Sequence, residues 1–118
     1  MKTTYRKEAL FKYTEYSTEV SFADSIFSND ANFKYTKFPR KVDFRNVEFH
    51  DLANFKYTEF PHGVSFKNAV FQGDSNFKYA KFYEPFDFEG TKFEDSVDFK
   101  YTKLEGKSFT LYLLKNKK

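Results

Sequence analysis

Aromatic rings recur along this chain at alternating intervals of five and six residues. The series begins at Phe11 and ends at Leu104, and only Tyr16 and Leu104 are not Phe. Its members are Phe11, Tyr16, Phe22, Phe27, Phe33, Phe38, Phe44, Phe49, Phe55, Phe60, Phe66, Phe71, Phe77, Phe82, Phe88, Phe93, Phe99 and Leu104. Two residues before each member, the side chain is small or β-branched, with Phe86 as the exception. Because a spacing of two places both side chains on one side of an extended segment, the pattern predicts short strands and not helices.

Four successive units add up to 22 residues, and the pentapeptide NFKYT at 32–36 returns at this interval at 54–58. We therefore expect a solenoid in which each unit forms one side of a coil. The expected coils are Ala9–Asp30, Ala31–Leu52, Ala53–Asp74, Ser75–Ser96 and a last one from Val97 onward. Strands of about two to four residues should stack in parallel, with no long helix before the C-terminal segment. Polar stretches such as 61–63 and 73–74 suit the corners.

The repeating unit itself, as in ANFKY, TKFPR, VDFRN and VEFHD, resembles that of the pentapeptide-repeat proteins over roughly residues 3–105. The resemblance implies an all-β fold, a right-handed four-sided parallel β-helix, here with about five coils of 22 residues. Two features depart from the family pattern. The central residue is Phe almost throughout, where the family mixes Leu and Phe, and every second unit carries one additional residue.

The interior of such a coil explains the choice of Phe. Stacked strands repeat at ~4.8 Å, and offset-stacked rings tolerate centroid separations of about 4.5–7 Å. The predicted structural core contains the columns Phe11, Phe33, Phe55, Phe77, Phe99 and Phe22, Phe44, Phe66, Phe88. Phe86 occupies a position that is small elsewhere and follows Pro85, so we expect a local bulge at 83–85.

Composition narrows the function classes. The 118-residue chain has no Cys, which excludes disulfides and thiolate metal sites, and its net charge is +3. The N-terminal residues lack the apolar core of a secretory signal, and the longest apolar stretch is too short for a membrane span. We expect a cytoplasmic protein that does not span a membrane. His50 and His62 fall on different faces, so no catalytic, cofactor or metal site is predicted, and we expect no enzyme.

Two outward columns form the candidate binding face. They are Lys12, Lys34, Lys56, Lys78, Lys100 and Tyr13, Tyr35, Tyr57, Tyr79, Tyr101. One interpretation is a surface for nucleic acid or an anionic membrane, since lysines meet phosphates and aromatic rings stack with bases. The other is that Tyr suits an exposed strand and neighbouring Lys stems cover it. The parallel column of Thr14, Thr36, Thr58 and Thr102 has inward parity, which argues against an ice-binding ladder.

These features favour a non-catalytic β-solenoid that acts as a rigid protein-interaction module with an unknown partner. One alternative is binding of nucleic acid or an anionic surface through the Lys/Tyr face. The other follows from the resemblance, because some members of the family mimic DNA and inhibit type II topoisomerases. That activity depends on a strongly acidic surface, and we expect acidic residues to dominate only the fourth side of the coil.

The end of the chain departs from the repeat. We assign residues 1–108 to the solenoid and 109–118 to a C-terminal cap or dimerisation segment, because Phe109, Leu111 and Leu113 are too apolar for a solvated tail. Bare strand edges at a solenoid end invite association. In the family, C-terminal segments often form dimers, so the resemblance implies a possible homodimer through this segment.

Deletion of residues 109–118 should expose the last coil and cause aggregation, because the apolar edge would lose its cover. Light scattering and size-exclusion chromatography of the shortened chain measure this. A truncated protein that stays monomeric and unfolds at the same denaturant concentration as the full chain would contradict a capping role.

Overall fold

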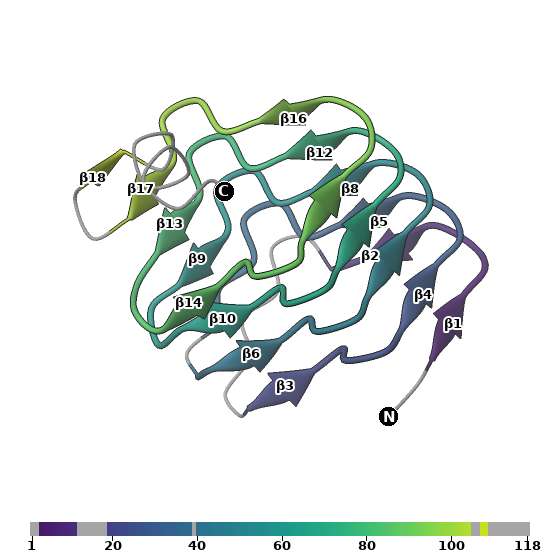
Figure 1. Ribbon diagram of the computed structural model, residues 1–118, viewed down its shortest axis with the longest axis horizontal. Helices are drawn as coiled ribbons and strands as arrows, with labels where there is room; N and C mark the ends of the chain where they lie inside the picture. The colour runs from purple at the N-terminus through teal and green to yellow at the C-terminus, as the bar shows by residue number, and fades with distance from the viewer. Residues whose placement is uncertain (1–2, 12–18, 39, 105–106, 109–118) are drawn as a thin grey trace.

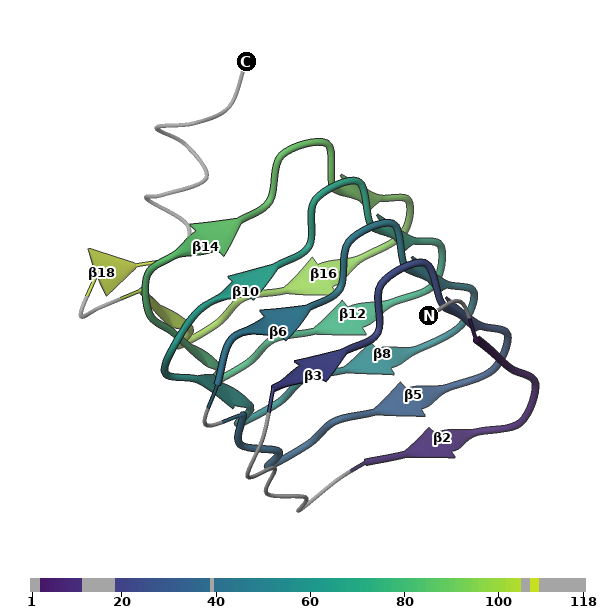
Figure 2. The ribbon, with the colours of Figure 1, turned by 90° about the horizontal axis from the view of Figure 1, so that it is seen from below.

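The computed structural model describes residues 3–11, 19–38, 40–104 and 107–108, and these residues form a four-sided parallel β-helix (Figures 1 and 2). Each side of the coil is a ladder of very short strands, and the chain steps from one side to the next through corners. The predicted fold class is confirmed. Segment 109–118, residues 12–18 and the predicted ring position Tyr16 lie outside the described residues.

Four sheets make the four faces, and every strand contains two residues. The first face consists of β2 (Ala9–Leu10), β5 (Ala31–Asn32), β8 (Ala53–Asn54), β12 (Ser75–Asn76) and β16 (Val97–Asp98). The second face consists of β9 (Glu59–Phe60), β13 (Lys81–Phe82), β17 (Lys103–Leu104) and β18 (Lys107–Ser108). The third face consists of β3 (Val20–Ser21), β6 (Val42–Asp43), β10 (Val64–Ser65) and β14 (Phe86–Asp87). The fourth face consists of β1 (Thr4–Tyr5), β4 (Ile26–Phe27), β7 (Glu48–Phe49), β11 (Val70–Phe71) and β15 (Lys92–Phe93).

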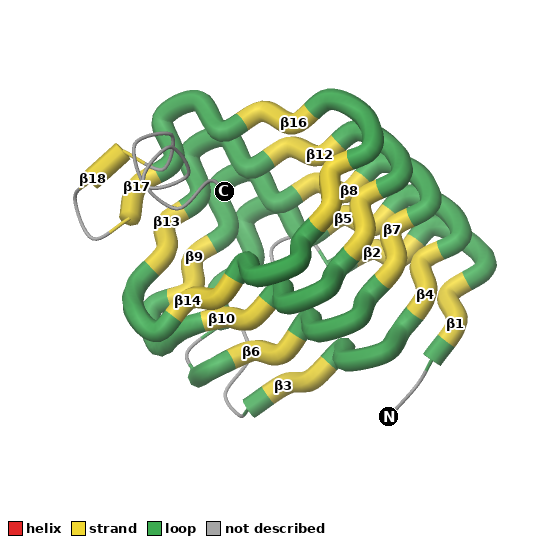
Figure 3. The backbone as a smooth tube through the Cα atoms, viewed as in Figure 1, coloured by secondary structure: helices red, strands yellow, loops and turns green. Residues whose placement is uncertain are grey.

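The strand register is constant. Val42 pairs with Val64 and Val64 pairs with Phe86, so each strand pairs with the strand 22 residues further along. All pairings are parallel except that of β17 with β18, which is antiparallel. Within the described ranges the chain is strand and loop, without a helix (Figure 3). The predicted coil length is therefore the observed one.

Two kinds of corner alternate around each coil. Tight corners follow the first and third faces, as where the Thr36 N–H donates to the Phe33 carbonyl at 3.0 Å. The third residue of such a turn has a positive φ, as in a type II turn. Longer corners follow the second and fourth faces and hold the additional residue. Gly63 ends one of them with a φ of 104°, and a Cβ there would lie 2.5 Å from the Pro85 carbonyl oxygen.

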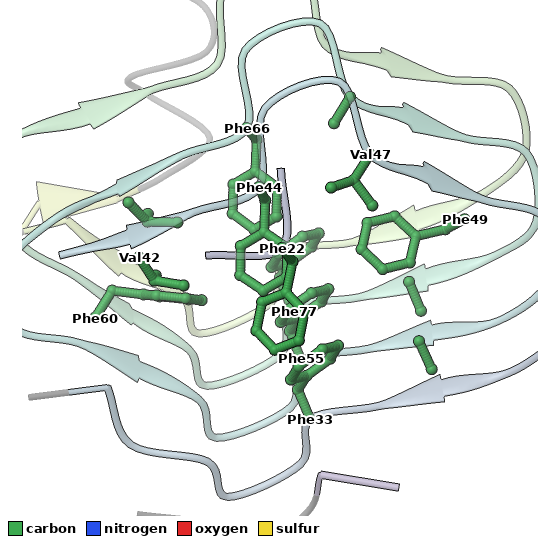
Figure 4. Packing of buried hydrophobic residues seen from close by; sticks show 14 of the residues in the cluster. Phe22, Phe33, Val42, Phe44, Val47, Phe49, Phe55, Phe60, Phe66 and Phe77 are labelled. Carbon is green, nitrogen blue, oxygen red and sulfur yellow. The ribbon is translucent and has the colours of Figure 1, made fainter. Parts of the chain in front are cut away.

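Stacked phenylalanine rings fill the coil (Figure 4). Phe55 lies between Phe33 and Phe77, with ring centroids 4.9 and 5.0 Å away and planes 2° apart. Phe44 belongs to the column of the third face and meets Phe55 edge to face at 5.5 Å. The two columns therefore interlock across the centre. The members at the ends of these columns, Phe11, Phe88 and Phe99, are only partly buried.

Buried threonines link successive coils. The Thr58 hydroxyl donates to the carbonyl of Phe33 at 2.7 Å, and Thr36 and Thr102 make the equivalent bond to the preceding coil. All three side chains are at most 4% exposed. Their inward position agrees with the predicted parity, and the hydrogen bond gives each buried hydroxyl a partner, as burial of a polar group requires.

The predicted bulge at residues 83–85 is wrong. Phe82 pairs with Phe60 and Phe86 with Val64, so the corner between them contains no additional residue. Pro85 follows a cis peptide bond and its carbonyl accepts the Val64 N–H at 3.0 Å. Phe86 is partly buried and packs against the core. β14 is the edge strand of its sheet, so the Phe86 ring has a neighbouring strand of this sheet, β10, on one side only.

Replacing core rings should separate their structural roles. Phe55→Ala should lower the free energy of unfolding by ~3–5 kcal/mol, because it empties a central stack. Phe86→Val should lower it by less than ~1.5 kcal/mol, since Val occupies the equivalent position in the coils before it. Urea unfolding followed by circular dichroism measures both. Equal losses for the two variants would show that Phe86 is as integral to the core as Phe55.

Candidate interaction surface at the Lys/Tyr corner

The candidate binding residues lie on the tight corner that joins the first face to the second. We call this surface the Lys/Tyr corner, and its described members are Lys34, Lys56, Lys78, Lys100, Tyr35, Tyr57, Tyr79 and Tyr101. Each Lys and Tyr occupy the two central positions of one turn, so every coil from the second onward contributes one of each. The candidates Lys12 and Tyr13 lie outside the described residues.

These tyrosines adopt a backbone conformation that Tyr seldom takes. The φ angles of Tyr35, Tyr57, Tyr79 and Tyr101 are 61°, 60°, 61° and 60°. The prediction that they sit on an exposed strand is therefore wrong, since they lie in turns. A left-handed conformation costs an ordinary L-residue ~1–2 kcal/mol. The tight corners that follow the third face use Asp24, Asn46, Asn68 and Gly90 instead, residue types that tolerate it better.

The rings form a ladder on the outside of the coil. Tyr35 and Tyr57 stack with centroids 4.7 Å apart, and Tyr57 and Tyr79 with centroids 4.8 Å apart. Tyr79 and Tyr101 continue the ladder at 4.8 Å. Such pairs contribute ~0.5–1.5 kcal/mol beyond area burial. Stacking between coils thus offsets the strain of the left-handed backbone, a compensation that the sequence pattern did not reveal.

Each lysine is held beside its own tyrosine. The Nζ atoms of Lys34, Lys56 and Lys78 lie 5.4, 5.5 and 5.8 Å from the centroids of the following Tyr rings, which is cation–π distance. The backbone of Lys56 is fixed as well, because its N–H donates to Asn54 Oδ1 at 3.0 Å. Equivalent bonds recur at Lys34, Lys78 and Lys100. The column of Asn residues on the first face therefore sets the corner geometry.

The resulting surface offers hydrogen-bond donors in a straight row. Ammonium groups only donate and Tyr hydroxyls can donate, so the natural ligand is an acceptor such as a carboxylate or phosphate. A nucleobase inserted between two rings would require a separation of ~7 Å, twice the contact distance of carbon atoms. The observed spacing of 4.7–4.8 Å leaves no such space. Base stacking within the ladder is therefore excluded while the rings stay in place.

A hollow of about 450 Å³ on the third face is a second place with polar side chains. It is lined by Asp43, Arg45, Lys67, Pro85 and Phe86, among others. Arg45 Nη2 binds Asp43 Oδ2 at 2.8 Å. Burial raises the pKa of the Asp43 carboxyl, but hydrogen bonds from Arg45 and its charge outweigh burial and hold the pKa below its ordinary value. The mixed charges of this hollow select no single class of ligand.

Groups suited to catalysis are dispersed in the described parts of the chain. His50 Nε2 lies 3.0 Å from Glu48 Oε1 on the fourth face, a pair that the sequence analysis did not identify. Residues two apart on an extended segment share a side, which is the signal that would have found it. No cluster of three His, Cys, Asp or Glu suited to a metal ion occurs among the residues that the structure describes. No helix there has the length and apolarity needed to cross a membrane.

The repeat pattern agrees with a known family. The sequence model of pentapeptide repeats, nine copies long, matches residues 11–59 and again 55–103. The chain therefore belongs to the pentapeptide-repeat family. No curated protein and no solved structure matches the chain closely enough for comparison.

Exchange of single tyrosines should reveal the balance between stacking and strain. Tyr57→Asn relieves the left-handed backbone but removes two ring contacts, so it should lower the free energy of unfolding by ~1 kcal/mol. Tyr101→Asn removes the stacking contact with Tyr79 at a side chain that is 62% exposed. It should therefore change the free energy by less than ~0.5 kcal/mol. Urea unfolding compares the two, and a stabilised Tyr57→Asn protein would show that stacking does not compensate the strain.

Proposed function

We propose that this protein is a non-catalytic β-solenoid that acts as a rigid protein-interaction module, with the Lys/Tyr corner as its interface. One observation carries the proposal: tyrosine occupies every described left-handed position of this corner, where Asn, Asp or Gly would be less strained. The other set of tight corners uses those residues with the same turn. A strained residue type retained at each coil of one corner favours a role on the surface beyond turn formation.

The geometry of the corner suits recognition of acidic side chains. The lysines and tyrosines are held by stacking, cation–π contacts and Asn hydrogen bonds before any partner arrives. A pre-organised surface loses less side-chain entropy on binding. Tyrosine is also enriched in protein interfaces, and lysines supply the charge that an acidic partner needs. The ligand class is therefore a protein segment or surface rich in Asp and Glu.

Binding of nucleic acid or an anionic membrane is the second candidate, favoured by the row of lysines. Phosphates of a duplex advance ~3.4 Å per residue along each strand and wind around the axis, so a straight row of cations meets few of them. Closed stacking of the tyrosines also removes the platform that single strands use. The topoisomerase inhibitor is the third candidate, and the basic Lys/Tyr corner disfavours it because a DNA mimic needs acidic sides.

Binding of simple polyanions tests the proposal. Poly-L-glutamate should quench or shift the tyrosine fluorescence of the protein, which contains no Trp, and its affinity should fall as salt rises. The combined substitution Lys34→Gln, Lys56→Gln, Lys78→Gln should weaken binding at least ~10-fold, since each lost contact removes a favourable charge interaction. The fold should be unchanged, because the lysine side chains lie outside the core.

A matched control removes the same charge elsewhere. The control variant changes three lysines of the second face, Lys37→Gln, Lys81→Gln and Lys103→Gln. It should bind poly-L-glutamate nearly as well as the wild type. Equal losses in both variants would mean that net charge and not the corner causes binding. Oligothymidylate and vesicles of anionic lipid are measured in parallel. Tighter binding of either than of poly-L-glutamate would reject protein interaction in favour of the second candidate.

A further inference from the structure

The corner that joins the fourth face to the first carries one aspartate before each of the strands β5, β8, β12 and β16. We call it the acidic corner, and its members are Asp30, Asp51, Asp74 and Asp95. Hydrogen bonds hold them in place: Asp51 Oδ1 accepts the Leu52 N–H at 3.0 Å, and Asp74 Oδ1 accepts the Ser96 hydroxyl at 2.7 Å. Asp30 and Asp95 make similar bonds at this corner. The carboxylates are thus fixed in a row along the solenoid.

The first face therefore lies between two rows of opposite charge. Asp30 precedes β5 and Lys34 follows it, and the same order recurs as Asp51 and Lys56 around β8. The third and fourth repetitions are Asp74 with Lys78 and Asp95 with Lys100. The two remaining corners mix charges within the described residues. One contains Arg40, Lys41 and Glu84, and the other contains Asp24, Arg45, Lys67 and Glu89.

The first face also concentrates the exposed apolar surface of the described residues. Their strongly exposed large apolar side chains are Leu10, Tyr35, Tyr83 and Tyr101, and all but Tyr83 lie on this face or at the Lys/Tyr corner. Leu10 is 59% exposed in β2, the edge strand of this face. The Asn side chains of the same central column fold back to the Lys backbone and are half-buried. The central column of this face is therefore uncharged except at Asp98, and charged side chains line both edges.

We infer that the first face binds a second copy of this chain. Two faces related by a two-fold axis parallel to the solenoid place the acidic corner of each copy on the Lys/Tyr corner of the other. Each coil of one copy then lies opposite the same coil of the other copy. The rise per coil is the same in both copies because their sequences are identical. A two-fold axis across the solenoid would place carboxylate on carboxylate, so charge selects the parallel arrangement. The inference rests on the proposed function, since it names the partner of the Lys/Tyr corner.

The size of the face predicts a weak dimer. Five coils at ~4.8 Å give a length of ~24 Å, and about five residues at ~3.3 Å give a width of ~17 Å. The contact would bury ~400 Å² on each copy, or ~800 Å² in total, which is below the standard size of a stable interface. Charge pairs at its rim are sensitive to salt. The dimer should therefore be populated at high protein concentration and low ionic strength and dissociate as either condition is reversed.

Sedimentation equilibrium tests the association, and charge reversal tests the surface. The wild type should approach twice the monomer mass at low salt. Lys56→Glu with Lys78→Glu makes the middle of both edges acidic, and Asp51→Lys with Asp74→Lys makes the middle of both edges basic. Each of these variants should sediment as a monomer under the same conditions. A wild-type chain that is monomeric at every concentration and salt would overturn the inference, and so would variants that still form dimers.

Mixing the two variants gives the matched control. An acidic face and a basic face complement each other along both edges, so the mixture should form a heterodimer although neither component forms a homodimer. Circular dichroism verifies that both variants remain folded. A mixture that stays monomeric while both components are folded would show that charge pairing across this face does not hold the dimer.

Cross-linking tests the parallel register, because the chain has no Cys of its own. Leu10→Cys should be cross-linked to its own copy by a short bis-maleimide reagent, since the two-fold axis brings equivalent positions of the face to the ~10 Å that separates packed sheets. The control Ser21→Cys, exposed on the third face of the same coil, should not. An antiparallel or end-to-end dimer separates the two copies of position 10. Absence of the Leu10→Cys cross-link in a sample that sediments as a dimer would overturn the parallel arrangement.

Failure of the dimer and failure of the proposed function are distinguishable. The Asp51→Lys with Asp74→Lys variant keeps the whole Lys/Tyr corner, so it should bind poly-L-glutamate even as a monomer. Binding of poly-L-glutamate by a strictly monomeric wild type would overturn the dimer and leave the interaction module intact.

Asp98, the charged member of the central Asn column, faces its own copy in this arrangement. Asp98→Asn should consequently strengthen the dimer, and a weaker dimer would count against it.

Discussion

The match between strand spacing and ring stacking governs this molecule. Neighbouring strands lie ~4.8 Å apart, and Phe33, Phe55 and Phe77 stack at 4.9 and 5.0 Å inside the coil. Backbone hydrogen bonds and aromatic contacts are therefore satisfied by the same repeat distance. Any slip in register by one residue would turn the rings outward, so the core also enforces the coil length. The regular outer columns follow from this constraint, because each coil places its outward residues directly above those of the coil before.

The interior was largely predictable from the sequence, and the corners were not. Spacings of five and six residues with a small residue two positions before each ring identify inward parity at Phe44 or Thr58 without further information. No comparable spacing rule shows whether an outward residue lies in a strand or in a turn. Tyr57 was interpreted as a strand residue because Tyr favours strands, but the turn requires a positive φ that propensity assigns to Asn or Gly. Stacking between coils offsets the strain of this turn, and the contact joins residues 22 positions apart, so no local propensity expresses it.

Phe86 shows the opposite error, in which the sequence suggested a defect that the structure lacks. The local rule of a small residue before each ring was broken, and a bulge was the expected response. The coil keeps its register because Gly63 leaves space beneath Pro85 and because the neighbouring rings are near the end of the solenoid. Tolerance of a large residue thus depends on its distance from the ends of the stack, which a repeat pattern does not express.

Because the register is constant, the length of the solenoid determines how many equivalent contacts it can make with a partner. A further 22 residues would lengthen the rod by ~4.8 Å and add one lysine, one tyrosine and one corner carboxylate in line with the others. Binding energy along such an edge grows by nearly equal increments, so affinity changes by a constant factor with each coil. Duplication or loss of a single coil would then change the affinity for the partner in discrete steps, while the types of side chain that make the contact stay the same. Each coil of the solenoid thus contributes one equivalent charge pair to the contact with a partner.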